Sequence, residues 1–187
     1  MILTILALPM IYISFLIRLF SSSPVIYHAV RVGKDRKLFN QLKYRTMIPF
    51  APDLRNPDGS TLNTHDDPRV TSIGKILRKL SLDELPQFIS VLKGDMSIVG
   101  PRPDPPSVIP LYRTQDFLRL SVLPGITGWA VIHGRNEISW ECRRDLDLEY
   151  VRKRSTALDL KIIMLTIPLA LFARGVYSST RAKEDVL

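Results

Sequence analysis

Two adjacent carboxylates, Asp83 and Glu84, stand in the stretch SLDELPQ. A pair of acids can hold a divalent cation together with phosphate oxygens, and an ionised carboxylate can act as a nucleophile. The alternative is a helix cap, because Ser81 and Glu84 have the spacing of a capping box, a first helical turn favours negative charge, and Pro86 fits there as well. The local pattern favours the cap, so the surrounding residues must decide whether the pair also does chemistry.

Several cations could neutralise phosphate groups near such a pair. Lys43 and Arg45 are two residues apart in a predicted strand, so they share one face, which is either a phosphate-binding face or a solvated one. Arg102 lies between two prolines, so a stiff loop presents its guanidinium either as an anion clamp or as part of a surface turn. The other available counter-charges are Arg78, Arg119 and Arg135.

The elements that would position these residues follow from the hydrophobic pattern. Residues 25–32 and 38–47 are rich in β-branched, aromatic and alternating apolar positions and flank a polar turn, which predicts a β-hairpin. Residues 47–68 are rich in proline and lack periodicity, so they form a long loop. We therefore expect a compact, irregular mixed α/β domain in which short helices surround a small hairpin.

Helical periodicity begins at Val70. Apolar residues at positions 73, 76, 77 and 80 form one stripe, and a second helix is predicted from Leu82 to Leu92, ended by Lys93 and Gly94. Asp83 then lies at the junction of the two helices and at the positive end of the second one. The helix dipole and Arg78 should lower the pKa of Asp83 there and keep the side chain ionised.

Two hydrophobic segments point to a membrane. Residues 1–17 carry no charge and reach ~26 Å as a helix, slightly short of a ~30 Å hydrocarbon core. Pro9 lies in the middle, so we expect a membrane helix broken at that residue. Residues 162–173 are too few to cross a bilayer and have basic flanks, which is typical of an interfacial amphipathic helix or, alternatively, of an ordinary core helix.

Composition limits the remaining choices. A chain of 187 residues with a net charge of +8 is large enough for one domain and favours an anionic partner. Cys142 is the only cysteine, which excludes a disulfide framework and a cysteine-based zinc site. The basic residues are spread among loops and no nucleic-acid-binding motif is found, so we expect no nucleic-acid partner.

Four strings in order, KYRTM, SLDELPQ, GDMSIVGPRP and PGITGWA with GRN after it, resemble the bacterial sugar-transferase family of monotopic polyprenyl-phosphate phosphoglycosyl transferases. The resemblance implies a Mg²⁺-dependent enzyme that moves a sugar-1-phosphate from a nucleotide sugar, usually a UDP-sugar, to undecaprenyl phosphate and releases UMP. This is the first membrane step of surface-glycan synthesis. It also implies a catalytic domain on the cytoplasmic face of the bacterial plasma membrane, while the oligomeric state stays open, with a homodimer among the alternatives.

The resemblance assigns roles to individual residues. Asp83 is the nucleophile, forms a phosphosugar–aspartyl intermediate and helps to hold the metal, and Glu84 assists. The residues expected to bind substrate are Lys43, Arg45, Arg78, Arg102, Arg119, Arg135, Asn136 and Asp147. Residues 1–23 form the membrane-anchoring segment and residues 24–187 the catalytic domain, with a lipid-facing underside.

The chain also departs from the family pattern. Only eight residues precede Pro9, so either the start of the chain is truncated or the anchor differs from the family's re-entrant helix. Leu123, Val131 and His133 replace a basic residue, a glutamine and an asparagine in the loop expected to bind the donor. An altered sugar preference and a binding or scaffold protein without turnover therefore remain alternatives.

Overall fold

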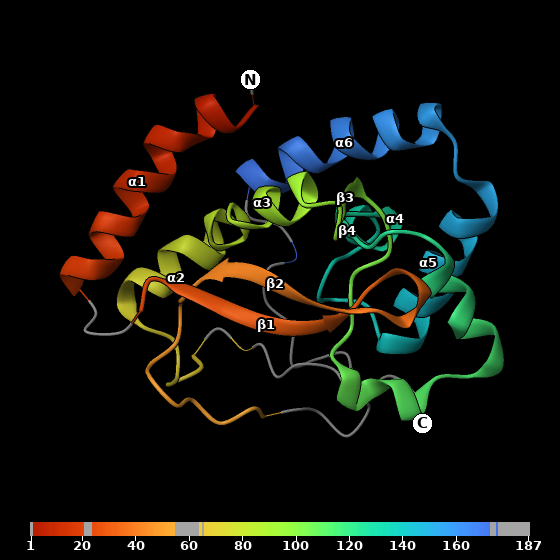
Figure 1. Ribbon diagram of the computed structural model, residues 1–187, viewed down its shortest axis with the longest axis horizontal. Coiled ribbons are helices and arrows are strands. Elements are labelled where there is room, and N and C mark those ends of the chain that lie inside the picture. Colours follow the sequence, from red (N-terminus) through yellow and green to blue (C-terminus); the bar gives the residue numbers. More distant parts are fainter. Residues whose placement is uncertain (1, 21–23, 55–63, 65, 173–174, 176–187) are drawn as a thin grey trace.

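The computed structural model describes residues 2–20, 24–54, 64, 66–172 and 175 (Figure 1). It is a mixed α/β domain of mostly short helices and two small sheets, as expected. Its elements in chain order are α1 (Ile2–Phe20), β1 (Ile26–Val32), η1 (Lys34–Arg36), β2 (Leu38–Tyr44), α2 (Ser72–Lys79), η2 (Leu82–Glu84), α3 (Gln87–Leu92), β3 (Ser97–Val99), η3 (Pro106–Leu111), η4 (Thr114–Ser121), β4 (Gly125–Thr127), α4 (Trp129–Ile132), α5 (Trp140–Lys153) and α6 (Thr156–Leu171).

The predicted hairpin is confirmed. β1 and β2 pair antiparallel, with Ile26 opposite Tyr44 and Val32 opposite Leu38. The connecting turn places Asp35 and Arg36 at positive φ, which reverses the chain within a few residues. A second sheet joins β3 and β4 in parallel, so segments on both sides of the η3 and η4 turns meet beside the hairpin (Figure 1).

The N-terminal helix packs against the rest of the molecule through one stripe. Ile13 and Ile17 of α1 are buried against Tyr44 of β2 and Leu77 of α2. The expected break at Pro9 is wrong, because α1 is continuous through this residue. A proline removes one helical hydrogen bond and bends a helix more often than it ends one when the flanking turns stay helical.

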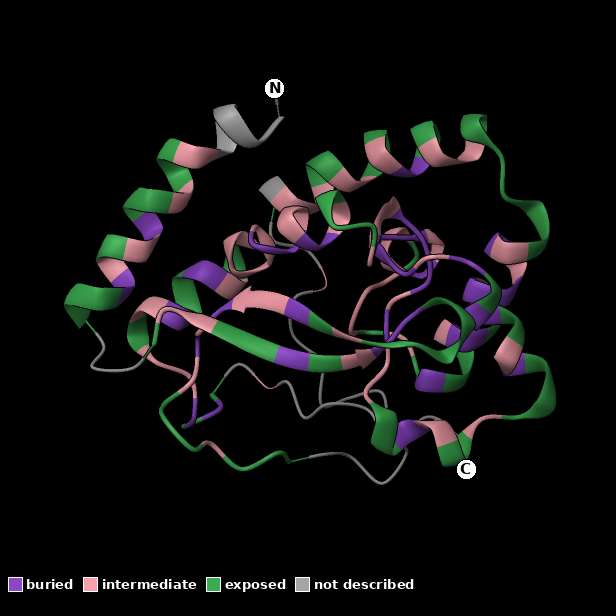
Figure 2. Ribbon diagram, viewed as in Figure 1, coloured by how far each residue is buried: buried purple, intermediate pink, exposed green. Residues whose placement is uncertain are grey.

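The opposite side of the molecule has its own core. Ile162 of α6 is fully buried against Val99 of β3 and Tyr150 of α5. Other apolar residues of α6 face outward, among them Met164 and Ile167 (Figure 2). One stripe of the helix is therefore core, as the second alternative expects, and the remainder is exposed; an interfacial position of this helix stays a prediction.

α1, α3 and α6 lie along the upper side of the view, above the hairpin (Figure 1). No helix in the described part of the chain has both the length and the apolar character needed to cross a membrane.

The helix predicted from Ser81 is wrong in its first turn. Ser81 adopts a left-handed conformation with φ 57° and caps nothing through its side chain. A 3₁₀ turn at Leu82–Glu84 follows, and the α-helix begins only at Gln87, after Pro86. The C-terminal expectation is confirmed, since α3 ends at Leu92 and Gly94 has φ +81°. The capping explanation for the two acids is thereby removed.

Candidate active site

The turn that carries Asp83 and Glu84 is short and held at both ends. The left-handed Ser81 ends the path of α2, and Pro86 with φ −61° leads into α3. Between them Leu85 N–H donates to the carbonyl of Leu82 at 3.3 Å. The charges of Lys43 and Arg102 act on both carboxylates, but only Glu84 bonds these two cations.

Glu84 is the neutralised member of the pair. Its Oε1 accepts from Lys43 Nζ at 3.0 Å and from Arg102 Nη2 at 3.1 Å. Burial acts to raise the pKa of Glu84, but the positive charges of Lys43 and Arg102 outweigh it and hold the pKa well below its usual range. Glu84 is therefore an ionised anchor that fixes two cations from different segments.

Asp83 is the available member. Its carboxylate makes no hydrogen bond or ion pair with any described residue. Burial and the charge of Glu84 raise its pKa to about 6, against the opposing charges of Lys43, Arg78 and Arg102. The expected lowering of this pKa is wrong, because burial of the carboxylate and the adjacent ionised Glu84 outweigh the surrounding cations, and no α-helix begins at this residue. At neutral pH it is still mostly ionised and more basic than an ordinary aspartate, which favours nucleophilic attack.

Two further predicted cations surround the turn. Arg78 donates from Nε to Thr46 Oγ1 at 2.9 Å, and its charge acts on Asp83. Arg135, in a left-handed conformation with φ 50°, donates from Nη2 to Ser81 Oγ at 2.9 Å, and its charge acts on Glu84. The structure thus gathers Lys43, Arg78, Arg102 and Arg135 around the two acids.

Arg45 does not join this group. Its Nε donates to the carbonyl of Pro24 at 2.9 Å, and its guanidinium lies 5.7 Å from the ring centroid of Tyr27. The regular strand ends at Tyr44, so the alternation that placed Arg45 beside Lys43 no longer applies there. Asn136 follows Arg135 directly, and its backbone N–H donates to the carbonyl of Gly175 at 3.3 Å.

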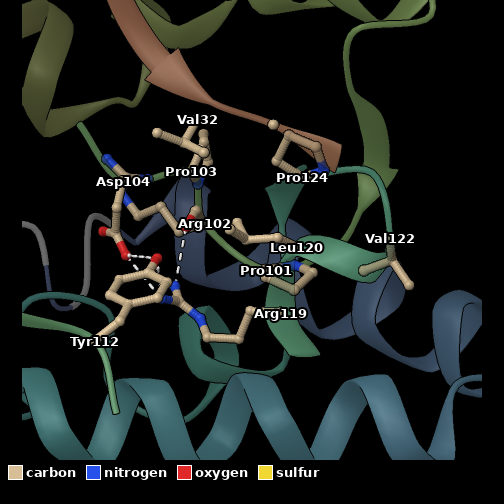
Figure 3. A pocket seen from close by; sticks show the side chains of 11 residues that line it. Val32, Pro101, Arg102, Pro103, Asp104, Tyr112, Arg119, Leu120, Val122 and Pro124 are labelled. Atoms are coloured by element: carbon tan, nitrogen blue, oxygen red, sulfur yellow. Dashed lines mark hydrogen bonds and ion pairs between the residues drawn. The ribbon is translucent and has the colours of Figure 1, made fainter. Parts of the chain in front are cut away.

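Arg119 and Asp147 are buried and belong to one network. Figure 3 shows Arg119 beside Arg102, Asp104 and Tyr112. Arg119 pairs with Asp147 at 2.8 Å and with Asp104 at 2.7 Å. It also donates from Nη2 to the carbonyl of Arg102 at 3.1 Å, while Tyr112 donates to Asp104 at 2.7 Å. These contacts are those of a support for the loop, whereas the sequence predicted direct substrate contacts for Arg119 and Asp147.

The same loop is fixed from two other sides. Gly125 N–H donates to the carbonyl of Pro101 at 3.0 Å, and Val32 N–H donates to the carbonyl of Asp104 at 2.9 Å. A side chain on Gly100 or Gly125 would collide with the backbone of the other segment, so only glycine permits this approach. A small hollow beside the loop is lined by residues of β1, the loop, η4 and the segment that connects η4 to β4 (Figure 3).

Sequence reasoning missed several supporting residues. Asp104 directly follows the Pro-Arg-Pro string, and only this position in the sequence could have indicated that it belongs to the site. Tyr112 and Arg143 belong to no motif, and each makes its contact with a residue eight positions away, across a turn that no periodic pattern indicated. Ser81 was noticed, but as a helix cap, whereas its hydroxyl accepts from Arg135.

The site offers Mg²⁺ one available carboxylate, that of Asp83. No cluster of three or more histidine, cysteine, aspartate or glutamate side chains occurs within the described ranges, so the fold builds no all-protein cage there. Mg²⁺ commonly binds one or two carboxylates and completes its shell with water and substrate phosphates. Asp83 fits this mode, whereas the Oε1 atom of Glu84 is already engaged by two cations.

An ionised carboxylate without an ion pair, ringed by cations on a rigid α/β scaffold, defines a site for phosphate-group chemistry. The family model described as bacterial sugar transferase matches residues 1–173, and the chain belongs to this family.

Two relatives of similar length match most of the chain. The uncharacterized sugar transferase EpsL of Bacillus subtilis is 45% identical over 169 residues, which cover 90% of this chain and 81% of the relative. The exopolysaccharide production protein ExoY of Rhizobium meliloti is 38% identical over 173 residues, which cover 87% of this chain and 76% of the relative.

A third relative is longer. The UDP-glucose:undecaprenyl-phosphate glucose-1-phosphate transferase of Escherichia coli is 45% identical over 163 residues, which cover 83% of this chain but 35% of the relative. This chain thus corresponds to about a third of that protein.

Asp83→Asn should raise stability above pH 6 in magnesium-free buffer. The pKa of Asp83 rises from 3.8 to about 6 on folding, so its ionisation opposes folding once the pH exceeds the unfolded value. We expect the variant and the wild type to have equal Tm near pH 4 and the variant to be higher by roughly 2–8 °C at pH 8. Glu137→Gln, at an exposed acid, is the control. A lower Tm for Asp83→Asn at pH 8 would show that the surrounding cations stabilise the ionised form.

Tyr112→Phe should lower the sugar-transfer kcat/KM by loosening the loop that carries Arg102. The variant removes the hydroxyl that bonds Asp104, which should cost about 1 kcal/mol of unfolding free energy. Tyr150→Phe is the matched control, because the Tyr150 hydroxyl donates to Asp159 at 2.8 Å in the core beneath α6. We expect the two variants to lose similar amounts of Tm, but only Tyr112→Phe to lose kcat/KM. If both variants lose kcat/KM equally, the effect of Tyr112→Phe is one of general stability.

Proposed function

We propose that this protein transfers a sugar-1-phosphate from a nucleotide sugar, a UDP-sugar, to undecaprenyl phosphate and releases UMP. The observation that carries the proposal is that the two adjacent acids have different contacts. Glu84 forms ion pairs with Lys43 and Arg102, whereas the Asp83 carboxylate forms none with the described residues and lies among cations. The name of the Escherichia coli relative, a UDP-glucose:undecaprenyl-phosphate glucose-1-phosphate transferase, supports the donor and acceptor classes. The two other relatives are named as a sugar transferase and an exopolysaccharide production protein, which agrees with a role in surface-glycan synthesis.

In the first step, a carboxylate oxygen of Asp83 attacks the phosphorus that carries the sugar. A bond forms between this oxygen and phosphorus, and the bond from phosphorus to the bridging oxygen breaks, so that UMP leaves with the electron pair. In the second step, a phosphate oxygen of undecaprenyl phosphate attacks the same phosphorus and releases the Asp83 carboxylate. Covalent catalysis thus divides one difficult displacement between two anions into two steps.

The surrounding cations make the attack by an anion on an anion feasible. Lys43 and Arg102 are held by Glu84, and Arg135 is held by Ser81, so these donors need little reorganisation when phosphate charge develops. A Mg²⁺ ion bound by Asp83 and the donor's phosphates would supply further charge neutralisation.

The test is turnover and trapping in a detergent-solubilised preparation. UDP-glucose and undecaprenyl phosphate should give UMP and a lipid-linked diphosphosugar, and chelation of Mg²⁺ should stop the reaction. Asp83→Asn should reduce kcat by at least ~10³-fold while the protein stays folded. With donor labelled in the sugar phosphate and no acceptor, label should attach to Asp83 and be found there after digestion. UDP-sugar binding without any turnover would instead support a binding or scaffold protein, and turnover that persists in Asp83→Asn would refute the nucleophile.

We also propose that the protein works at the membrane surface, where its lipid acceptor presents a phosphate. Large apolar side chains are exposed on α1 and α6, including Phe15 at 62%, Met164 at 71% and Ile167 at 56%. Helices whose outer side is apolar can lie in the headgroup region without crossing the bilayer. The catalytic domain would then face the cytoplasm, where nucleotide sugars are available.

Replacing Met164 and Ile167 by Asp should release the protein from membranes. Each change places a charge on the exposed side of α6 and leaves the buried Ile162 in place, so the fold should persist. Leu38→Asp, at a residue of β2 that is 62% exposed, is the control and should leave partitioning unchanged. Flotation with liposomes measures the bound fraction; equal binding by all variants would show that α6 does not dock.

A further inference from the structure

A further guanidinium, that of Arg143, adjoins the active-site cations. Arg143, on α5, donates from Nη2 to the backbone carbonyl of Arg135 at 2.8 Å. Burial and then the positive charge of the nearby Arg102 lower the pKa of the Arg143 guanidinium. Arg102, Arg135 and Arg143 therefore form one cluster of cations, in which Arg135 and Arg143 are eight residues apart and Arg102 comes from the Pro-Arg-Pro loop. Arg102 and Arg135 are the members that lie near Asp83 and Glu84.

Within the described part of the chain, Arg143 has no ion pair. The carboxylates whose charges reach it are Asp104 and Asp147. Both are engaged by Arg119, at 2.7 Å and 2.8 Å respectively. The two acids that could have neutralised Arg143 are thus already paired with Arg119.

The environment of Arg143 is costly without an anion. The residue is partly buried, and burial, followed by the charge of Arg102, lowers the pKa of its guanidinium. A guanidinium has five N–H donors in a planar fork that matches two phosphate oxygens. The single bond to the Arg135 carbonyl is the only side-chain hydrogen bond that the described residues offer it, so most of this donor capacity is unused.

We propose that Arg143 is a substrate-binding residue that, with Arg102 and Arg135, binds a phosphate group of the donor or the acceptor. The inference rests on the proposed function, because both substrates of that reaction carry phosphate. It adds a residue for which neither the sequence pattern nor the likeness to relatives indicated a role. Asp83 and Glu84 lie on the side of the cluster formed by Arg102 and Arg135, so a phosphate bound here would be adjacent to the nucleophile.

Two variants separate charge from support. Arg143→Gln keeps an N–H donor for the Arg135 carbonyl and removes the charge, whereas Arg143→Lys keeps the charge and loses the fork. Arg152→Gln, at an exposed arginine of the same helix, is the matched control. KM and kcat are measured in detergent micelles with UDP-glucose and undecaprenyl phosphate varied separately, and Tm is measured for every variant.

We expect Arg143→Gln to raise the KM for one of the two substrates by at least ~10-fold and to leave the other within about 2-fold, because a hydrogen bond to a charged group is lost. A KM rise for UDP-glucose would assign Arg143 to the donor, and a rise for undecaprenyl phosphate to the acceptor. Arg143→Lys should recover part of the effect, Arg152→Gln should match the wild type, and Tm should change little.

Binding provides a readout that does not need turnover. UDP-glucose and undecaprenyl phosphate are titrated into the Asp83→Asn protein with and without Arg143→Gln, and weaker binding of one of them is expected. If both affinities are unchanged, the inference is wrong, whatever the activity of the wild type. If Gln and Lys cause equal losses together with a lower Tm, Arg143 only supports the Arg135 turn, and the inference is also wrong. Absence of turnover in the wild type, with binding that depends on Arg143, would refute the proposed function alone.

Discussion

The interaction on which the site depends is the acceptance of two cations by one oxygen of Glu84. Lys43 arrives from the hairpin and Arg102 from the Pro-Arg-Pro loop, so this oxygen joins two segments to the turn at Leu82–Glu84. Removing charges from water is expensive, and an incompletely paired ion in a protein interior is destabilising. Glu84 offsets that cost for both cations. Its neighbour Asp83 is consequently not needed for neutralisation, and its carboxylate remains free for chemistry.

The support beneath Arg102 follows the same principle at greater depth. Arg119 is almost fully buried and is balanced by Asp104 and Asp147, and it holds the backbone of Arg102 through a carbonyl. Glycines on both sides let β4 approach the loop closely. A guanidinium presented in this way is fixed before a phosphate arrives, which is the condition for effective electrostatic stabilisation. The buried charges thus fix the position of the loop, and the exposed edge of the cluster is where we propose that phosphate binds.

Predictions based on local pattern succeeded where the chain's own neighbours decide the conformation. The hairpin was predicted because alternation and a polar turn are local properties, and the end of α3 at Gly94 depends on one residue's freedom at positive φ. They failed where distant contacts decide. Ser81 is left-handed, and its hydroxyl accepts a hydrogen bond from Arg135, which is far away in the sequence. Helix α1 continues through Pro9, and its buried stripe packs on Tyr44 and Leu77.

The amino-acid sequence by itself determined the family, the two acids and most of the cations that surround them, because residue types in ordered strings identify a chemistry. The tertiary structure decided how those residues divide the work. Contacts between segments that are separate in the chain decide three things. They decide which acid is neutralised, which arginine supports the loop and which arginine has no carboxylate partner. Coulomb interactions and desolvation depend on those distances and on burial, and neither quantity is present in a linear string.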